Sequence, residues 1–334
     1  NNLTSLDGLG HKQKLAYLDV NNNKLNDLAV VAECPMLTWL SAQNNEITDI
    51  SPLSSCPLLT KLTLGGNKIS DVSPLANCIQ LDTLDLSDNN IEDASSIKDC
   101  NALEELKISY NRLKDLEFCE KMINLKTFEA SANELTSLEG LRNVTLLENV
   151  RLADNMIESI EILKKNEHIV SLDLDNNQIY DLSPIGNEAD LVAMSVNNNM
   201  ITDLQALSGC PSLRYVAAAG NQITSLSGLE QCSQLNAADL GENQITDISA
   251  LEAIVSEEMG LLLQNNQIND ISALNGLKDY VYLSLYSNGI QDFSAMANMT
   301  NIGSNSILYI DWNDNMTGES LADIHYQTPK VVER

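Results

Sequence analysis

Residues 59–69 read LTKLTLGGNKI, and this stretch contains the frame that the rest of the chain repeats. Apolar residues stand eight, five and three positions before Asn67, and another stands two positions after it. The same frame returns with a period of 22 residues, and after small insertions towards the end of the chain. Its asparagines are Asn1, Asn23, Asn45, Asn67, Asn89, Asn111, Asn133, Asn155, Asn177, Asn199, Asn221, Asn243, Asn266, Asn288 and Asn315. A repeat of this length predicts a solenoid, in which each unit stacks on its neighbours and the chain offers an extended binding surface.

Each frame predicts one short strand followed by a turn. The residues of LxxLxL alternate between apolar and polar near their end, which is typical of a strand with one buried face. The asparagine follows where the chain leaves the strand. Its amide both donates and accepts hydrogen bonds, so we assign it the structural duty of pairing backbone groups in the turn.

The other half of the repeat predicts a short helical turn. Residues 49–53, 71–75 and 181–185 read DISPL, DVSPL and DLSPI. Serine before proline favours a helix start, with the serine hydroxyl as the cap. About six residues remain before the next strand, which suits short 3₁₀ segments. The aspartates that recur ahead of this serine are expected to be turn residues rather than a paired-carboxylate active site: Asp27, Asp49, Asp71, Asp93, Asp115, Asp181, Asp203, Asp247, Asp270 and Asp292.

The fold class that follows is α/β: a right-handed solenoid with a parallel β-sheet on its concave face and short 3₁₀ or irregular turns on its convex face. One repeat domain is expected over residues 1–315, with a C-terminal capping segment over 316–334. The spacing from Asn288 to Asn315 holds five extra residues, a loop or the start of that cap. The chain opens inside a repeat, so we expect the natural protein to extend upstream.

Composition excludes two classes of partner. The net charge of −28 argues against nucleic acid, because phosphate binding depends on Lys and Arg. No run of 18 apolar residues exists to insert into a membrane. Residues 1–165 carry 15 basic and 25 acidic side chains, whereas residues 166–334 carry 4 and 22. Either this acidic surface serves solubility, or the C-terminal half meets a cationic partner.

The seven cysteines follow the repeat. Six of them, Cys34, Cys56, Cys78, Cys100, Cys210 and Cys232, stand eleven positions after a repeat asparagine, and Cys119 occupies another apolar position. With an odd count and no CxxC motif, they are expected to be buried free thiols that act as small hydrophobes. An oxidised pair among the stacked cysteines stays open, and free thiols fit a cytosolic compartment better than an oxidising one.

Motifs for chemistry are absent from the sequence. The three histidines are far apart, and neither HExxH nor a phosphate-binding GxxxxGK loop occurs. Asp173, Asp175 and Asn177 imitate the start of a calcium loop, but Gln178 and Pro184 replace its essential glycine and glutamate. We therefore expect no enzyme activity, no metal and no cofactor.

The candidate binding residues are outward-facing strand positions, six, four and two before each asparagine. Six of the fourteen aromatic residues fall there, although core packing does not require them. Tyr215, Leu262, Tyr282, Tyr286 and Tyr309 are expected to form an apolar shelf rimmed by Asp239 and Asp311, and Tyr17 with Trp39 a second, smaller contact. Exposed apolar patches with polar rims mark interaction sites. The alternative is that these rings only stabilise neighbouring strands. The hypothesis is a protein ligand with exposed basic residues, with a glycan as the variant.

The run NxITDISPLxxCxxL resembles the 22-residue leucine-rich repeats of internalin-type bacterial surface proteins. This resemblance covers at least residues 1–293 and implies a non-enzymatic recognition or adhesion module, extracellular or on a bacterial surface. Cysteine replaces the usual leucine in many units, and no anchoring or immunoglobulin-like segment occurs in this stretch. The regulatory leucine-rich subunit of type-one protein phosphatase is similar in repeat length, and it implies a cytoplasmic scaffold as the alternative.

Overall fold

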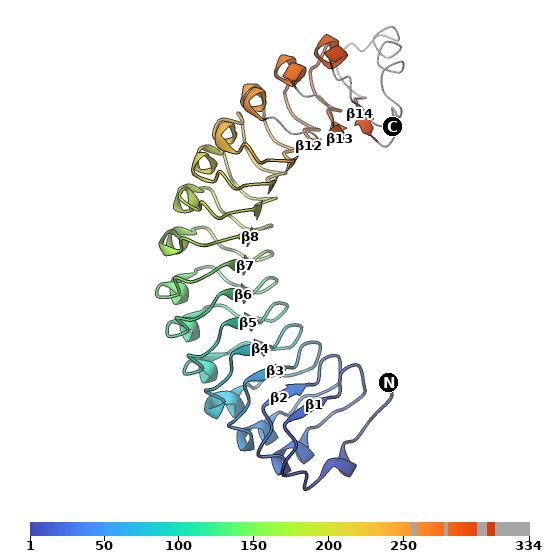
Figure 1. Cartoon of the computed structure of the whole chain (residues 1–334), viewed down its shortest axis with the longest axis vertical. Coiled ribbons are helices and arrows are strands. Elements are labelled where there is room, and N and C mark those ends of the chain that lie inside the picture. Colours follow the sequence, from blue (N-terminus) through green and yellow to red (C-terminus); the bar gives the residue numbers. More distant parts are fainter. Residues whose placement is uncertain (255–258, 277–279, 299–305, 311–334) are drawn as a thin grey trace. The chain divides into compact units, whose positions relative to one another are not determined.

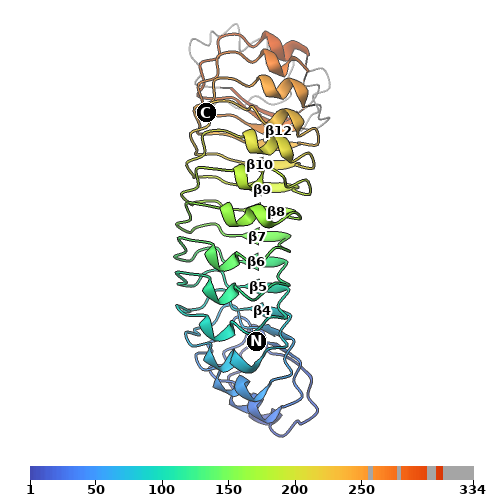
Figure 2. The same cartoon turned by 90° about the vertical axis from the view of Figure 1, so that its left-hand side faces the viewer.

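The computed structural model describes residues 1–254, 259–276, 280–298 and 306–310. It divides into two compact units, residues 1–158 and 159–334, and the same repeat builds both. In each unit a short strand alternates with a 3₁₀ helix (η), and the described residues contain no α-helix. The strands of a unit lie along one side and the 3₁₀ helices along the opposite side (Figures 1 and 2).

The first unit contains seven strands and seven 3₁₀ helices. The strands are β1 (Tyr17–Asp19), β2 (Trp39–Ser41), β3 (Lys61–Thr63), β4 (Thr83–Asp85), β5 (Glu105–Lys107), β6 (Thr127–Glu129) and β7 (Asn149–Arg151). The helices are η1 (Asp7–Leu9), η2 (Ala29–Glu33), η3 (Ser51–Ser55), η4 (Ser73–Asn77), η5 (Ser95–Ile97), η6 (Glu117–Cys119) and η7 (Glu139–Leu141).

The second unit has the same alternation over its described residues. Its strands are β8 (Ser171–Asp173), β9 (Ala193–Ser195), β10 (Tyr215–Ala217), β11 (Ala237–Asp239), β12 (Met259–Leu262), β13 (Tyr280–Ser284) and β14 (Ile307–Tyr309). Its helices are η8 (Glu161–Lys165), η9 (Ser183–Ile185), η10 (Gln205–Gly209), η11 (Leu229–Gln231), η12 (Ser249–Ala253), η13 (Ser272–Gly276) and η14 (Ser294–Asn298).

Consecutive strands within a unit pair in parallel, and the repeat sets their register. Trp39 lies beside Lys61, and Leu40 beside Leu62, one repeat apart. The middle residue of each three-residue strand points into the core, where Leu40 and Leu62 are fully buried. This is the predicted leucine-rich repeat solenoid with a parallel sheet and short 3₁₀ turns, so the fold-class prediction is confirmed. Within the described residues, no helix is long and apolar enough to cross a membrane.

The repeat asparagines pair backbone groups in the turns, as the sequence predicts. Asn45 donates from Nδ2 to the carbonyl oxygens of Val20, Ala42 and Gln43, at 3.0, 3.1 and 3.1 Å. Its Oδ1 accepts the backbone N–H of Leu25 at 3.0 Å. The bonds to Val20 and Leu25 reach the preceding coil, so Asn45 joins two coils through a buried amide.

The caps of the 3₁₀ helices correct one prediction. The serine hydroxyl does not cap: Ser51 Oγ donates to Asp49 Oδ2 at 3.0 Å. The side chain that serves this helix start is Asp49, just before the N-cap residue Ile50: its Oδ1 accepts the backbone N–H of Ser51 at 2.8 Å. All ten recurring aspartates accept the N–H two residues onward in this way. An aspartate carboxylate accepts more strongly than a hydroxyl, and these bonds lower the pKa of Asp93 and Asp247.

All seven cysteines are free and buried, so the prediction of buried thiols is confirmed. Cys34, Cys56, Cys78 and Cys100 stack on consecutive coils, and Cys56 Sγ lies 3.5 Å from the carbonyl oxygen of Val31 on the coil before it. Burial raises the pKa of Cys56 and Cys78 to about 11 and that of Cys100 to about 12. A thiol with such a pKa is protonated at neutral pH and acts as packing.

The last strand lies in a different register from the predicted one. Tyr282 lies beside Ile307, and Tyr309 lies beside Ser284. Tyr309 therefore belongs to the row four before the asparagine rather than six before it, because the insertion after Asn288 is two residues shorter than the asparagine spacing suggested. Asp311, Asn315 and the predicted cap over 316–334 lie outside the described residues, as does most of the predicted insertion around Met296 to Ser306.

Candidate binding site

The shelf predicted from the sequence follows the second unit's sheet in two rows. Tyr215, Ala237, Gly260 and Tyr282 are neighbours on β10, β11, β12 and β13, in that order. The small residues between the two tyrosines leave the sheet uncovered there, and Tyr215 is 43% exposed. Side chains on this face point away from the core because the strand residues alternate.

The second row carries the polar rim and Tyr309, whose ring pairs with Tyr282 of the first row. Asp239 lies beside Leu262, Leu262 beside Ser284, and Ser284 beside Tyr309. The rings of Tyr282 and Tyr309 lie 5.3 Å apart between centroids and are tilted by 46°. This geometry falls in the range of favourable aromatic pairs, so the two rings support each other across β13 and β14.

A recess lies beside Tyr282, Tyr286 and Tyr309 on the strand face of the second unit. Its volume is about 90 Å³, and it is lined by Leu262, Gln264, Tyr282, Ser284, Tyr286 and Tyr309. Four of these six belong to the predicted site, so the structure brings Leu262, Tyr282, Tyr286 and Tyr309 together around one hollow. Gln264 and Ser284 were not predicted as site residues.

The rim of the shelf is electronegative. Burial raises the pKa of the Asp239 carboxyl above its ordinary value, and the charges of Glu242 and Asp175 raise it further. The backbone N–H of Gly241 donates to Asp239 at 3.3 Å and acts in the opposite direction. Burial raises the pKa of the Tyr215 hydroxyl, and the charges of Asp239 and Asp175 raise it further. Among the described residues, neither Asp175 nor Asp239 has a basic side chain within ion-pair distance.

The predicted smaller contact lies on the first unit. Tyr17 and Trp39 are neighbours on β1 and β2, with ring centroids 6.3 Å apart and a tilt of 47°. Tyr17 is 71% exposed, and Trp39 is partly covered. Both predicted contacts therefore contain two rings that touch, Tyr17 with Trp39 and Tyr282 with Tyr309. The alternative, in which the rings only stabilise neighbouring strands, requires the same ring contacts.

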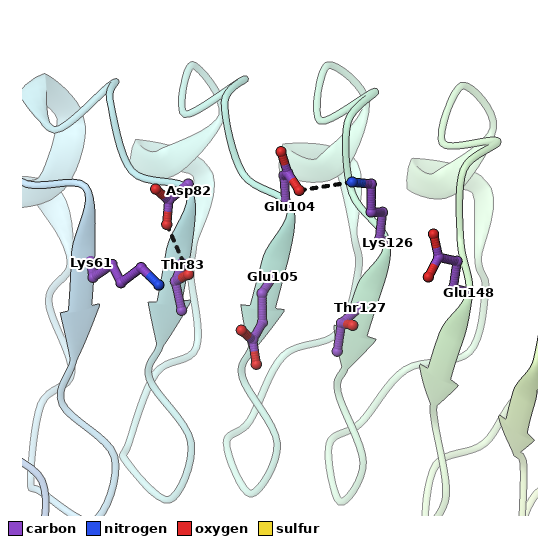
Figure 3. Close-up of a pocket in the computed structure, with 8 residues that line it drawn as sticks. All are labelled: Lys61, Asp82, Thr83, Glu104, Glu105, Lys126, Thr127 and Glu148. Atoms are coloured by element: carbon purple, nitrogen blue, oxygen red, sulfur yellow. Dashed lines mark hydrogen bonds and ion pairs between the residues drawn. The ribbon is translucent and has the colours of Figure 1, made fainter.

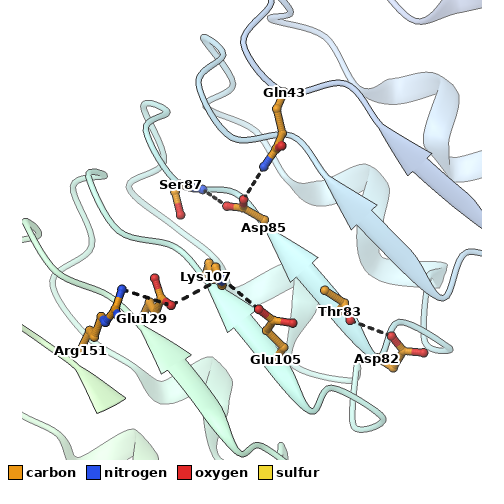
Figure 4. Close-up of polar contacts among 9 residues, drawn as sticks. All are labelled: Gln43, Asp82, Thr83, Asp85, Ser87, Glu105, Lys107, Glu129 and Arg151. Carbon is orange, nitrogen blue, oxygen red and sulfur yellow. Dashed lines mark hydrogen bonds and ion pairs between the residues drawn. The ribbon is translucent and has the colours of Figure 1, made fainter. Parts of the chain in front are cut away.

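The charges on strands β5 to β7 of the first unit are neutralised internally. Lys107 contacts Glu105 at 3.0 Å and Glu129 at 3.5 Å, and Arg151 contacts Glu129 at 3.8 Å (Figure 4). Gln43 donates to Asp85 at 2.7 Å across two coils, and Asp85 also accepts the backbone N–H of Ser87. These side chains alternate in sign along the sheet, so the carboxylates here already have cationic or amide partners.

A larger hollow of about 410 Å³ lies at the edge where strands β3 to β6 begin. Its walls are charged and polar: Lys61, Asp82, Thr83, Glu104, Glu105, Lys126, Thr127 and Glu148 (Figure 3). Lys126 pairs with Glu104 at 2.9 Å. Sequence reasoning missed this hollow because half of its residues stand seven before the asparagine, outside the three outward-facing positions. The charge at that position, strong from Asp82 to Glu148, was the available signal.

Within the described ranges, no group of three His, Cys, Asp or Glu side chains is arranged to hold a metal ion. The calcium-loop imitation at Asp173 and Asp175 has a structural explanation in the repeat. Asp175 Oδ1 accepts hydrogen bonds from Ser195 Oγ and from the backbone N–H of Asn197, both at 2.6 Å. These bonds join neighbouring coils.

Comparisons with known proteins agree with the repeat architecture. A family described as "Leucine Rich repeats (2 copies)" matches residues 35–77, and one described as "Leucine rich repeat" matches residues 57–113. A sequence comparison with curated proteins gives no match.

Solved structures extend the likeness over most of the chain. The internalin InlF of Listeria monocytogenes is 27% identical, with a TM-score of 0.79 over 91% of this chain and 83% of that one. The functional domain of InlJ from the same organism, described as including a cysteine ladder, is 25% identical, with a TM-score of 0.73 over 93% and 67%. A leucine-rich repeat protein of Leptospira interrogans, 24% identical with a TM-score of 0.79 over 91% and 82%, shares the fold.

Proposed function

Because the chain is an internalin-like leucine-rich repeat protein, a protein-interaction module by architecture, we propose that it binds a protein ligand through the strand face of its second unit. The binding residues are Tyr215, Asp239, Leu262, Tyr282, Tyr286 and Tyr309. Asp311, outside the described residues, extends the rim in this proposal. The role is recognition rather than catalysis.

The observation that carries this proposal is the contrast between the two strand faces. In the first unit, Lys107 and Arg151 neutralise the neighbouring glutamates. In the second, three tyrosines line a recess, and Asp239 lies beside Leu262 of that recess with no basic partner among the described residues. Tyrosines dominate the energetics of protein interfaces, and an uncompensated carboxylate favours a basic partner. The ligand surface therefore carries exposed Lys or Arg.

Tyr17 and Trp39 form a second contact in this proposal, by the same reasoning on a smaller scale. A glycan ligand is the variant, because stacked aromatic rings beside carboxylates also suit sugars. Competition with free oligosaccharides separates the two, since sugars would displace a glycan ligand and leave a protein ligand bound.

The experiment is selection of peptides from a random display library on the immobilised chain. Peptides that bind through the shelf are expected to be rich in Lys or Arg and to lose binding when Tyr282 and Tyr309 are changed to alanine. Tyr180, which is 62% exposed and lies off the strand face, is the matched control: Tyr180→Ala should retain binding. Melting temperatures should stay nearly equal in all variants. Undiminished affinity of the Tyr282 and Tyr309 variants refutes the proposal.

The proposed location is the surface of a bacterium or its surroundings, supported by the likeness to InlF and InlJ. The alternative is an intracellular scaffold, favoured by the seven free thiols. Protease shaving of intact cells of the source organism, with mass spectrometry of the released peptides, decides between them. Peptides released from intact cells support the surface location, and retention until lysis contradicts it.

A further inference from the structure

Two residues that line the recess on the second unit each hold a buried acceptor atom with no hydrogen-bond partner among the described residues. These atoms are Oε1 of Gln264 and Oγ of Ser284. Ser284 belongs to an outward-facing row, yet it is only 1% exposed, because the residues around the recess cover it. Leaving such a group unpaired costs about 1–3 kcal/mol, so an orphaned pair in one hollow calls for an explanation.

The same repeat position in the first unit shows that the register does not leave the serine hydroxyl without a partner. Ser41 corresponds to Ser284 and is also buried, at 4% exposure. Its Oγ lies 2.8 Å from Asn21 Oδ1 and 2.6 Å from Thr63 Oγ1. Gln43 corresponds to Gln264, and its Nε2 donates to Asp85 at 2.7 Å. The unpaired hydroxyl of Ser284 is therefore particular to the recess.

We propose that the recess receives the ammonium group of one lysine side chain of the protein ligand. The ammonium donates to Gln264 Oε1 and Ser284 Oγ once these two side chains turn toward it, and the methylene groups of the lysine pack against the rings of Tyr282 and Tyr309. The hollow of about 90 Å³ is several times the roughly 10–15 Å³ that one water needs, so the end of a side chain fits.

Three features favour an ammonium over other groups. A glutamine oxygen only accepts, so the occupant must donate. The tyrosine rings attract a cation through their faces. Asp239 lies beside Leu262 at the edge of the recess and adds a negative charge. The two acceptors come from separate coils and are neutral, which suits a compact ammonium with rotatable donors better than the flat fork of a guanidinium.

This inference rests on the proposed function but is narrower than it. The shelf could bind a basic protein without inserting a lysine. The test therefore uses a probe that occupies only the recess: n-butylammonium, which reproduces the end of a lysine side chain, with n-butanol as the neutral counterpart and n-butylguanidinium as the arginine counterpart.

The measurement is the ring NMR signals of ¹³C-labelled tyrosines during titration of the full chain. We expect n-butylammonium to shift the Tyr282 and Tyr309 signals until they saturate. The affinity of n-butanol should be at least about tenfold lower, because n-butanol lacks the ionic hydrogen bond and the cation–π attraction. Ser284→Ala and Gln264→Leu should each weaken n-butylammonium by about fivefold or more. Gln264→Glu should strengthen it by adding a carboxylate of the same shape. Gln43→Leu, the same repeat position in the first unit, should change nothing.

Equal binding of n-butanol, tighter binding of n-butylguanidinium, or unchanged affinity in both recess variants overturns the lysine assignment. Ser284→Ala removes an unpaired hydroxyl, so it should melt no lower than the parent, and a loss of binding cannot then be attributed to unfolding. If library peptides depend on Tyr282 and Tyr309 while n-butylammonium does not bind, the recess proposal fails and the proposed function stands. If neither binds, both fail.

Discussion

Replacing one repeat asparagine tests how the coils are joined. Asn199 is 8% exposed, and its Oδ1 accepts the backbone N–H of Ile179 at 2.9 Å. Its Nδ2 donates to the carbonyl oxygens of Leu174, Val196 and Asn197, at 3.0, 3.2 and 3.1 Å. Asn199→Ala removes all four bonds and leaves their backbone partners in the core.

The four losses are not equal. Each of the three carbonyl oxygens has a second donor: Leu174 accepts from Asn177 Nδ2 at 3.1 Å, Val196 from Asn221 Nδ2 at 2.9 Å, and Asn197 from the N–H of Asn176 at 2.8 Å. Only the backbone N–H of Ile179, on the preceding coil, is left unpaired, at a cost of about 1–3 kcal/mol. With smaller losses from the shared bonds, we expect Asn199→Ala to lower the free energy of unfolding by roughly 2–4 kcal/mol.

Asn199→Asp sharpens the test. The carboxylate keeps the bond from the N–H of Ile179 but directs negative charge at three carbonyl oxygens that formerly faced an amide. We therefore expect Asp to destabilise more than Ala at pH 7.5, and the difference to shrink as the pH falls towards 4, where the carboxyl can bind a proton.

Urea unfolding followed by circular dichroism measures both variants, with the slope of the transition checked for a change in cooperativity. The exposed Asn187 provides the control, and Asn187→Ala should stay within about 0.5 kcal/mol of the parent. A loss below about 0.5 kcal/mol in Asn199→Ala, or equal stability of the Asp and Ala variants at pH 7.5, refutes the reasoning.

Three further predictions concern the core. Burial raises the pKa of Glu188 to about 7, against about 4.3 when unfolded, so its contribution is full below pH 4 and is lost as the pH rises through 7. Glu188→Gln should therefore stabilise the protein at pH 8 and not at pH 4, by urea unfolding. A Cβ on Gly140 would overlap the carbonyl oxygen of Leu116, so Gly140→Ala should lower the free energy of unfolding by at least about 1–3 kcal/mol. The thiol of Cys56, with its pKa at about 11, should not react with Ellman's reagent in the native protein, nor should the other six buried thiols.

Each of these has its own control. Glu252, an exposed glutamate, should show no pH-dependent gain on change to glutamine. Gly8 has no atom within 4 Å of the added methyl group, so Gly8→Ala should be tolerated. The thiols should react in full after unfolding in urea. Equal gains from Glu188→Gln at both pH values, an unaffected Gly140→Ala variant, or rapid native reaction of the thiols would contradict the respective argument.

The repeat made most of the fold predictable from the sequence. A frame that recurs in one register states which residues are buried and which backbone groups each asparagine pairs, because every coil must fit the next one. The same regularity misled in two places. Serine before proline suggested a hydroxyl cap, but Asp49 and its equivalents precede it with a stronger acceptor. The asparagine at 315 suggested a register that β14 does not have, because apolar burial of Leu308 and Ile310 decides the alignment.

The candidate site was predictable only in part. Strand alternation places Tyr282 and Leu262 on the outward face, and counting along the repeat is enough to find them. It does not reveal that Ser284, also outward-facing, would be covered and left without a partner. Nor does it indicate the charged hollow around Lys126, which depends on side chains reaching across several coils. Both features arise from side-chain packing, which the period alone does not specify.

The asparagine ladder also bears on how the protein is synthesised. The N–H of Ile179 waits for an acceptor that lies 20 residues further along the chain, in Asn199. A coil leaving the ribosome therefore stays incomplete until the following coil has emerged, which at about 5–20 residues per second takes roughly 1–4 seconds. During that interval its newest turn holds an unpaired amide, so the growing end is the point at which a nascent chain is most open to chaperones and proteases.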